Sequence, residues 1–530
     1  MSSKTFYITT PIYYPSDDLH IGHAYCSVAA DTMAKYKRMR GYDVFFLTGT
    51  DEHGQKIEEV ARERGLEPQV FVDQMLVKIK DLWKLMHVDY DGFIRTTDPN
   101  HVKAVQHIFV KLNEKGDIYE GVYEGWYCTP CESFWTESQL LDGLCPDCQR
   151  PVEKTREKSY FFRLSKYENR LKQLFHDHSD FVEPASRAHE MINNFLEAGL
   201  EDLAVSRSNF SWGVPLPFAD DSIAYVWVDA LCNYITALGY PDDTELFDRY
   251  WPADVHLVGK EIMRFHSLIW PALLMALDLP LPKKIFGHGW LLFEGGKMSK
   301  SKGNVVDPAI LVDRYGLDAL RYFLLREFPF GSDGNYSTEA LIKRSNSDLA
   351  NDFGNLLSRV VAMISQSFPE GFPSEKDFDQ VDIDLTNLAD ETAAKVEQHF
   401  DKMEFSLVLA SIWHLIGQSN KYIDLTTPWI LAKEEESRSR LAAVLYTLAD
   451  VLRRIAVWIS PFMVDTPAKV RQQLGITDAG EEINTELSSW ESAAESGLYR
   501  DDFIVQKGKP IFPRIDIRAE LSTIEKLDEI

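Results

Sequence analysis

The sequence has little positive charge for its size. Its 530 residues carry 82 Asp and Glu against 56 Lys and Arg, which gives a formal charge of −26. This balance disfavours a protein that coats DNA irrespective of sequence, because such binding needs a broad cationic face. Local basic patches remain possible, and the stretches KYKRMR (35–40) and KMSKSKGN (297–304) are two of them.

Long apolar runs are also lacking. The longest, LIWPALLMAL (268–277), contains a proline and is far shorter than the roughly 20 residues that cross a bilayer. The N-terminal stretch MSSKTFYITTPIYY has no charged segment followed by an apolar one, so no signal peptide is expected. With 45% apolar and 12% aromatic residues, the composition predicts a folded, soluble, cytoplasmic protein without a membrane partner.

Cysteine is scarce, yet four of the six cysteines fall within one short stretch, CTPCESFWTESQLLDGLCPDC. They form two C-x-x-C pairs: Cys128, Cys131, Cys145 and Cys148. A set of four thiolates prefers tetrahedral Zn²⁺ and leaves no position for water, so we expect one structural zinc per chain. Free thiols, a redox pair or an iron–sulfur cluster are the alternatives, and the second pair argues against the first two. Cys26 and Cys232 are expected to be core residues.

The first part of the chain alternates strand and helix signals. TFYITTPIYY (5–14) and DVFFLTGT (43–50) are predicted strands, and between them a predicted helix over 20–40 ends at Gly41. Continuously apolar strands joined by a helix indicate a parallel sheet, with ligands at the carboxyl ends of the strands. Strand signals resume at AYVWVDALCNYI (224–235), DVHLVGKEIMRFHSLIW (254–270) and KIFGHGWLL (284–292). After about Asp333 only helical periodicity remains, which predicts a separate helical bundle.

The stretch YPSDDLHIGHAY (14–25) places His20 and His23 three residues apart, behind Asp17 and Asp18. A divalent metal site, a phosphate site and a surface or helix-capping pair are all compatible with this pattern. Two histidines at i, i+3 suit one metal less well than a pair at i, i+4. Because the helix follows a buried strand directly, its N-terminal amides and dipole face the expected ligand crevice, and Gly22 allows close approach.

A second basic motif, KMSKS (297–301), lies on a glycine-flanked segment far along the chain. Lys297 and Lys300, together with the two imidazoles and the helix N-terminus, would form a cage for a polyphosphate. Neither a Walker A motif nor G-x-G-x-x-G is present, so the common nucleotide-binding loops are excluded.

HIGH (20–23) followed by KMSKS resembles the paired signature of class I aminoacyl-tRNA synthetases. TTPIYYPSDDLHIGH, TGTDEHGQK, YVWVDAL, VGKEIMRFHSLIWP and GKMSKSKGNVVDP specifically resemble bacterial-type methionyl-tRNA synthetases, and the C-x-x-C pairs resemble the connective domain of the single-zinc branch. The resemblance covers Tyr7 to about Asp465. It implies ATP-dependent ligation of methionine to the 3′ adenosine of tRNA(Met), including the initiator, through methionyl-adenylate.

The resemblance implies a role for each ATP-site residue. His20 and His23 would contact the phosphates and stabilise the transition state, while Lys297 and Lys300 would close over pyrophosphate, with the larger kinetic effect at Lys300. Mg²⁺ would accompany ATP. The implied ATP-binding set is His20, Gly22, His23, Lys260, Glu261, His288, Lys297, Met298 and Lys300. Asp17 and Asp18 then become turn and helix-capping residues.

For methionine, the resemblance implies that Asp51 holds the α-ammonium group. The implied pocket comprises Ile12, Tyr14, Trp227, Ala230, Leu231, Tyr234, Ile262, His266 and Trp270. From the residues alone, Trp227 and Trp270 would be ordinary core residues, and His266 a hydrogen-bonded core histidine.

For tRNA, the resemblance implies that Asn355, Arg359 and Trp429 read the anticodon, with Trp429 stacking on a base. From the residues alone, Asn355 and Arg359 would be a solvated helix face. Some members of the family carry a further C-terminal module that dimerises, which this chain lacks, so a monomer is expected.

The expected fold class is α/β, a Rossmann-type parallel-sheet catalytic domain with a zinc-binding insertion, followed by an all-α bundle. The expected divisions are the first half of the catalytic domain (1–115), the connective insertion (116–222), the second half of the catalytic domain (223–290), the KMSKS and stem-contact region (291–345), the anticodon-binding helices (346–475) and a C-terminal extension (476–530).

Two other functions are compatible with parts of the sequence. A nucleotidylyltransferase shares the H-x-G-H turn but leaves the helical region after Asp333 without a purpose. A non-enzymatic RNA-binding protein with zinc knuckles leaves the sheet and both phosphate motifs unexplained.

Overall fold

The structure is a computed structural model that describes residues 4–146, 148–293, 296–297, 306–476 and 485–520. The chain forms two compact units. The first comprises residues 1–34, 42–84 and 88–290, and the second comprises 35–41, 85–87 and 291–530.

A six-stranded, fully parallel sheet forms the centre of the first unit, in the order β3-β2-β1-β11-β12-β7. Its strands are β1 (Thr5–Thr9), β2 (Asp43–Thr50), β3 (Gly92–Arg95), β7 (Val182–Glu183), β11 (Val255–Gly259) and β12 (Ile285–His288). The chain runs from β1 outward to β2 and β3 on one side, and the later strands extend the sheet on the other. The strand order therefore reverses between β1 and β11, where a doubly wound sheet opens a crevice for ligands.

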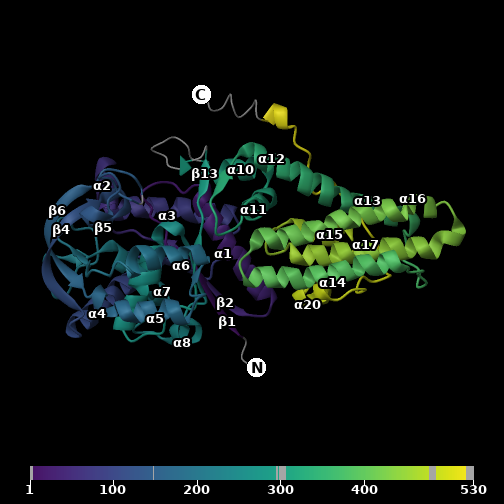
Figure 1. Cartoon of the computed structure of the whole chain (residues 1–530). Helices are drawn as coiled ribbons and strands as arrows, with labels where there is room; N and C mark the ends of the chain where they lie inside the picture. Colours follow the sequence, from purple (N-terminus) through teal and green to yellow (C-terminus); the bar gives the residue numbers. More distant parts are fainter. Residues whose placement is uncertain (1–3, 147, 294–295, 298–305, 477–484, 521–530) are drawn as a thin grey trace. The chain divides into compact units, whose positions relative to one another are not determined.

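Helices connect the strands of this sheet (Figure 1). They are α1 (Ile21–Met39), α2 (Gln55–Glu63), α3 (Pro68–Leu85), α4 (Pro99–Glu114), α5 (Glu168–Asp177), α6 (Ala185–Met191), α7 (Val226–Thr236), α8 (Glu245–Tyr250) and α9 (Trp270–Ala276). The predicted strand 43–50 and the predicted helix 20–40 are confirmed as β2 and α1. Gly41 follows α1 with φ 75°, as expected for a residue that ends a helix.

The cysteine-containing segment folds on an antiparallel sheet in the order β5-β4-β6-β8. Its strands are β4 (Ile118–Cys128), β5 (Ser133–Trp135), β6 (Glu153–Phe162) and β8 (Leu203–Ala204), and a short pair, β9 (Ser206–Arg207) with β10 (Ile223–Ala224), follows. Between β6 and β8 the chain returns to the main sheet, where Val182 and Glu183 pair with Ile285 and Phe286 of β12.

The second unit is mainly helical. Its principal helices are α10 (Pro308–Tyr315), α11 (Leu317–Arg326), α12 (Thr338–Arg344), α13 (Asn355–Ser367), α14 (Gln380–Asp401), α15 (Phe405–Thr426), α16 (Pro428–Leu431), α17 (Arg438–Trp458), α18 (Thr466–Gln473), α19 (Thr485–Ser488) and α20 (Trp490–Ala494). Helices α14, α15 and α17 lie side by side (Figure 1), and each buries an apolar stripe. A small sheet of β13 (Leu291–Phe293), β14 (Gly296–Lys297) and β15 (Gly334–Tyr336) precedes them.

Arg321 and Asp318 of α11 join this unit internally. The guanidinium of Arg321 is fully buried and donates hydrogen bonds to the carbonyls of Met86, His87, Pro461 and Phe462. Asp318 accepts hydrogen bonds from the backbone amides at the start of α18. One turn of α11 thus fixes two segments that are distant in the sequence.

Two predicted strands are longer than those observed: the strand predicted over 5–14 ends at Thr9, and of 254–270 only Val255–Gly259 is a strand before helical turns begin. Two further predictions about secondary structure were wrong. AYVWVDALCNYI is not a strand after Ala224 but helix α7, which is buried on nearly every side. A helix without a polar face has the same continuous apolar run as a buried strand, so periodicity cannot separate them. The second error concerns the region after Asp333, which includes the short strand β15 before the helices begin.

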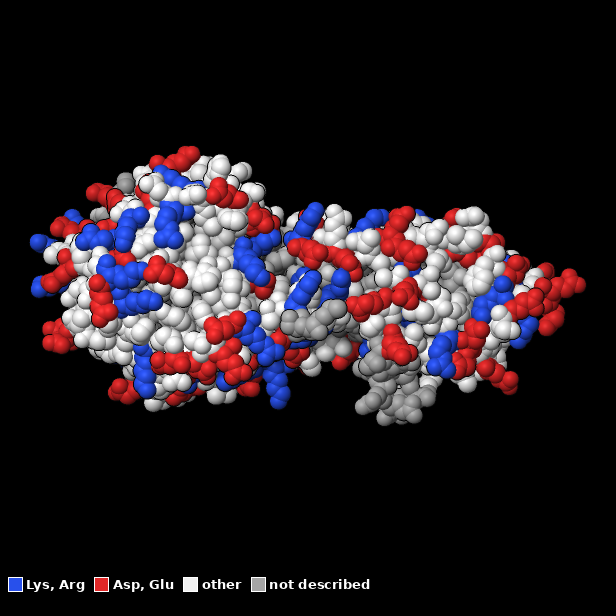
Figure 2. Space-filling view, turned by 90° about the horizontal axis from the view of Figure 1, so that it is seen from below, with Lys and Arg blue, Asp and Glu red and all other residues white. Residues whose placement is uncertain are grey.

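Acidic and basic side chains are interspersed over the face seen in Figure 2. On that face the negative formal charge is therefore spread out. None of the described helices combines the length and the apolar character needed to cross a lipid bilayer.

Candidate active site

His20 and His23 cap the N-terminus of α1. His20 precedes the first helical residue, Ile21, and its carbonyl accepts from the amides of His23 (2.9 Å) and Ala24 (3.2 Å). Its Nδ1 accepts from the amide of Gly22 (3.1 Å), and Nδ1 of His23 accepts from the amide of His20 (3.0 Å). The bond from the amide of His20 to His23 has the i, i+3 spacing of one half of a capping box, whereas the side chain of His20 accepts from residue i+2, Gly22.

The cap determines the tautomer of the two rings. Because each Nδ1 accepts a hydrogen bond, the proton of each neutral ring lies on Nε2, so Nε2–H is the donor of each ring. The rings lie close together, with centroids 4.0 Å apart. Gly22 is required by this packing, since a Cβ there would lie 2.9 Å from Cε1 of His20. Asp17 accepts from the amide of Asp18 (2.9 Å) in the preceding turn, in keeping with a turn role, and His20 accepts from the amide of Gly22 at the start of α1.

Asp51 follows β2 at the same edge of the sheet as the start of α1. Its backbone amide donates to the carbonyl of Tyr13 (3.0 Å), and its side chain is buried. Among the described residues, its Oδ1 has no hydrogen-bond partner. Burial raises the pKa of Asp51 well above its ordinary value, and the carboxylates of Asp229, Glu132 and Glu52 raise it further. A buried acceptor in this state is suited to a cation supplied by a ligand.

Asp229 of α7 supplies part of the negative potential at Asp51. It accepts hydrogen bonds from Nδ1 of His53 (2.7 Å) and Nε2 of His101 (2.9 Å). Burial opposes its ionisation, but the two histidines lower the pKa of Asp229 to about 2. It therefore stays ionised behind Asp51.

Apolar and aromatic side chains from α7 and from the segment after β11 form one core cluster, and burial, with a contribution from the charge of Asp51, raises the pKa of Tyr234 within it. The expected pocket residues Leu231, Tyr234 and Trp270 belong to one core cluster, against which Ile12, Tyr14, Trp227 and Ile262 pack. Ala230 is buried on the same helix as Leu231. Asp51 is close enough to Tyr14 that its charge, after burial and Glu132, raises the pKa of that phenol.

His266 presents a neutral ring to this cluster. Nδ1 lies 2.9 Å from the carbonyl of Ile262 and must donate to it, so Nε2 accepts from the hydroxyl of Tyr234 (2.7 Å). Burial lowers the pKa of His266 to about 4. The ring is held in one tautomer, without charge, beside an apolar wall. His266 lies on a π-helical turn (Phe265–Ile269), a distortion that is frequent at functional sites.

The ends of β11 and β12 place three expected ATP-site residues together. Gly259 pairs with His288, and Lys260 and Glu261 follow directly. Trp290 donates to Glu261 (2.7 Å), and the ammonium of Lys260 lies 4.0 Å from the centre of the Trp290 ring. His288 donates from Nδ1 to the carbonyl of Gly289 (2.8 Å), and burial lowers its pKa.

The lysine motif is only partly described. The backbone of Lys297 pairs with Leu292 in the small sheet of the second unit. Met298 and Lys300 lie outside the described residues.

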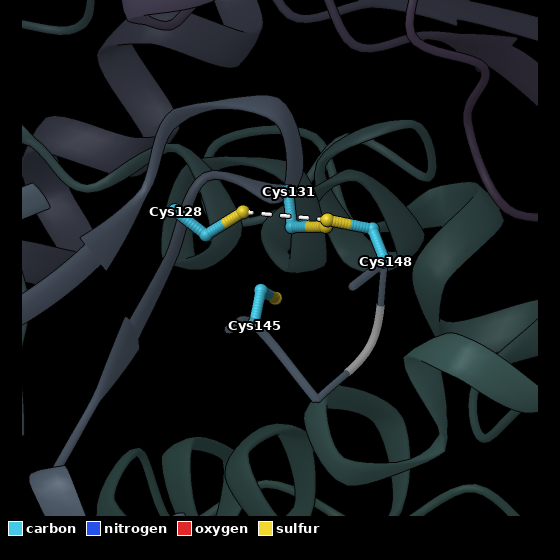
Figure 3. A group of neighbouring side chains, drawn as sticks. All are labelled: Cys128, Cys131, Cys145 and Cys148. Atoms are coloured by element: carbon cyan, nitrogen blue, oxygen red, sulfur yellow. Dashed lines mark hydrogen bonds between the residues drawn. The ribbon is translucent and has the colours of Figure 1, made fainter. Parts of the chain in front are cut away.

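Cys128, Cys131, Cys145 and Cys148 converge (Figure 3). Their sulfur atoms all lie within 4.8 Å of one another, and those of Cys128 and Cys148 are 3.5 Å apart. Four sulfurs around zinc at about 2.3 Å would be roughly 3.8 Å apart, so the cluster has the size and donor type for such an ion. Trp126, Trp135, Leu140 and Val152 form a small core around it.

In the helical unit, Asn355 and Arg359 lie on α13. Asn355 is exposed, and Arg359 pairs with Asp424 of α15 (3.2 Å). Trp429, on α16, has 45% of its surface exposed, which is unusual for a tryptophan in a folded bundle. Arg359 is thus tied to the end of α15, five residues before Trp429.

Three residues beside the pocket were not among the expected site residues. Phe265 stacks on Trp227 with centroids 3.9 Å apart. Asp229 was hidden in an apparent apolar strand. Glu132 follows the first cysteine pair, where a glutamate is ordinarily a surface residue, yet it is buried.

Comparison with known proteins identifies the class first. Residues 6–156 and 150–361 match the family model described as tRNA synthetases class I (M), and residues 382–507 match the anticodon-binding domain of tRNA ligases. The parallel sheet with HIGH at its switch point, and a helical unit that matches the anticodon-binding domain, define a class I aminoacyl-tRNA synthetase.

The particular family follows from full-length relatives. The methionine–tRNA ligase of Caldanaerobacter subterraneus subsp. tengcongensis is 61% identical over 99% of this chain and 81% of its own length, and that of Clostridium tetani is 56% identical over 100% and 81%. The Mycobacterium tuberculosis methionyl-tRNA synthetase in complex with methionyl-adenylate superposes with a TM-score of 0.91, at 41% identity, over 96% of this chain and 100% of that one. The chain belongs to the methionine–tRNA ligases, which confirms the resemblance drawn from HIGH and KMSKS.

The capping role of His20, which uses Nδ1, can be tested separately from the role of its Nε2–H as a hydrogen-bond donor. His20→Asn keeps a side-chain oxygen for the amide of Gly22, whereas His20→Ala removes it at a cost of about 1 kcal/mol. We expect both variants to lose ATP-dependent activity by roughly 100-fold, since neither has an Nε2 donor. Only His20→Ala should lower the urea concentration at the midpoint of unfolding of the first unit. Equal destabilisation by both substitutions would contradict the cap.

The raised pKa of Asp51 predicts proton release when an amino acid binds. A ligand ammonium favours the ionised carboxylate, so binding lowers this pKa and methionine affinity should fall as pH drops through the pKa of the free enzyme. Calorimetry at pH 6 in two buffers of different ionisation enthalpy measures the release. Asp51→Asn should bind more weakly and release no proton from this site, and unchanged release in that variant would refute the assignment.

Proposed function

We propose that the chain is an ATP-dependent methionine–tRNA ligase, which joins methionine to ATP and then transfers it to the 3′ adenosine of tRNA(Met), initiator included. Its full-length similarity to methionine–tRNA ligases carries the proposal. The buried Asp51 beside a wall of aromatic and aliphatic side chains supports an amino acid with an apolar side chain.

In the first step a methionine carboxylate oxygen attacks the α-phosphorus of ATP. The new O–P bond forms as the bond to the β-phosphate oxygen breaks, and pyrophosphate leaves with the electron pair. No protein nucleophile is needed, so positioning and charge stabilisation supply the catalysis. In our proposal the Nε2–H groups of His20 and His23 donate to phosphate oxygens, and Lys297 and Lys300 neutralise the leaving pyrophosphate. Gly22, Lys260, Glu261, His288 and Met298 complete the ATP site.

Methionine binding would use two contrasting surfaces. Asp51 would pair with the α-ammonium group. The side chain would enter the pocket of Ile12, Tyr14, Trp227, Ala230, Leu231, Tyr234, Ile262, His266 and Trp270. The neutral, tautomerically fixed His266 supports a thioether over a charged side chain, because it offers a polarisable wall without a net charge.

Two metal ions belong to the proposal. Mg²⁺ would arrive with ATP and neutralise phosphate charge. One Zn²⁺ would be held by Cys128, Cys131, Cys145 and Cys148 and would hold the two cysteine turns together; four protein ligands leave it no open position for catalysis.

For tRNA, Asn355, Arg359 and Trp429 would read the anticodon. The exposed ring of Trp429 supports stacking on an unstacked base. The guanidinium of Arg359, which is held near the end of α15 by Asp424, supports hydrogen bonding to such a base. We further propose the domain limits given above, a monomeric state, and a cytoplasmic location, where ATP and tRNA are available together.

Pyrophosphate–ATP exchange tests the function directly. We expect methionine to stimulate exchange, and leucine, isoleucine and valine to do so at least about 100-fold less efficiently, because the pocket must discriminate in shape and polarity. Charging of tRNA(Met) tests the second step. Folded protein that shows no methionine-dependent exchange would refute the proposal.

Metal analysis tests the cysteine site. We expect about one zinc per chain, because the four thiolates make a closed tetrahedral site. The double variant Cys145→Ser/Cys148→Ser should lose the metal, while Cys26→Ser, at a cysteine outside the cluster, should retain it. Iron or no metal in the wild-type protein would contradict the zinc assignment.

A further inference from the structure

Glu132, directly after Cys131 in the first cysteine turn, has its side chain buried inside the first unit. Its backbone has φ 51°, in the left-handed region, and only 4% of its surface is exposed. A carboxylate on a metal-binding turn is ordinarily solvated, so its burial needs partners.

The partners belong to the methionine side of the site. Oε1 of Glu132 accepts from the hydroxyl of Tyr14 (3.1 Å) and from the backbone amide of Lys56 in the first turn of α2 (2.9 Å). Oε2 accepts from the hydroxyl of Tyr127. The Glu132 carbonyl accepts from Tyr225 (2.6 Å), just before α7.

The preceding residue makes a parallel contact. The carbonyl of Cys131 accepts from the indole N–H of Trp227 (3.2 Å), whose ring stacks on Phe265. Two neighbouring residues of the cysteine turn therefore hold two aromatic residues of the methionine pocket, Tyr14 and Trp227.

Gly54 shows how closely this contact is built. It lies in the motif that contains Asp51, with φ 111°, and a Cβ there would lie 2.6 Å from the hydroxyl of Tyr14 and 2.9 Å from Oε1 of Glu132. The absence of a side chain at Gly54 lets the carboxylate reach both Tyr14 and the N-terminus of α2.

We propose that Glu132 is a positioning residue for methionine binding, which couples the cysteine turn to the methionine pocket by holding the ring of Tyr14 and the start of α2 beside Asp51. The inference rests on the proposed function. Glu132 is not proposed to touch the substrate, and its side chain acts through Tyr14. We expect the length of this side chain, which lets its carboxylate reach Tyr14, to matter more than its charge.

Three substitutions separate reach from charge. Glu132→Ala removes the acceptor, and Glu132→Asp keeps the charge but withdraws it by one methylene. Glu132→Gln keeps the length and an acceptor oxygen for Tyr14 and Lys56. The matched control is Glu124→Ala, which removes an exposed glutamate of the same insertion, on β4, that forms an exposed ion pair with Arg156 at 3.8 Å.

Methionine and ATP affinities are measured separately, by tryptophan fluorescence and by calorimetry, on protein with a verified metal content. We expect Glu132→Ala and Glu132→Asp to raise the Kd for methionine about tenfold, with the Kd for ATP and the metal content within twofold of wild type, since both lose the hydrogen bond that holds the hydroxyl of Tyr14. Glu132→Gln should stay within threefold, and Glu124→Ala should match wild type.

A double-mutant cycle with Tyr14→Phe measures the coupling between the two residues in methionine binding. A merely structural role of Glu132 would not produce this coupling. The effects of Tyr14→Phe and Glu132→Asp on methionine Kd should be strongly non-additive, because both break the same hydrogen bond. Unchanged methionine Kd in Glu132→Asp, equal losses for methionine and ATP, or additive effects would overturn the inference. If wild type itself binds no methionine, the proposed function fails instead.

Discussion

The parallel pairing of β1 with both β2 and β11 is the constraint on which the rest of the site depends. It places the ends of three strands at one edge, with Thr9 opposite His256 and Leu47. The start of α1, the Asp51 turn and the Lys260 turn then converge although they come from residues more than two hundred positions apart. Ligand chemistry follows from this convergence, because helix N-termini and unpaired side chains meet there away from the sheet's own hydrogen bonds.

Within that edge, protonation is controlled by hydrogen bonds to backbone groups. His20 and His23 accept at Nδ1 from backbone amides, whereas His266 and His288 donate from Nδ1 to carbonyls. The first pair therefore presents donors at Nε2, and the second pair presents acceptors. The tautomer of each ring is thus set by its backbone partner, which is an amide for His20 and His23 and a carbonyl for His266 and His288.

Much of this arrangement could be predicted from local pattern. The strand DVFFLTGT matches β2, since an apolar run closed by a turn leaves few alternatives, and the two C-x-x-C pairs do converge. The strand predicted at AYVWVDALCNYI is wrong because α7 is buried on nearly every side and has no polar face. For the same reason the sequence did not indicate that Asp229 is an ionised group held by two histidines. The i, i+3 spacing of His20 and His23 is compatible with a metal site. It is equally the spacing of a capping-box bond, because the imidazole of His23 accepts from the amide of His20.

Glu132 marks the limit of such prediction. Its burial depends on a left-handed backbone, a glycine 78 positions earlier and a tyrosine 118 positions earlier, none of which leaves a periodic signal. Nothing in a C-x-x-C-E stretch distinguishes a solvated glutamate from one that faces a pocket. The insertion therefore cannot be treated as a separable module on sequence grounds. Its four cysteines form a cluster that could hold a metal ion, and Glu132, directly after Cys131, contacts Tyr14 and the first turn of α2.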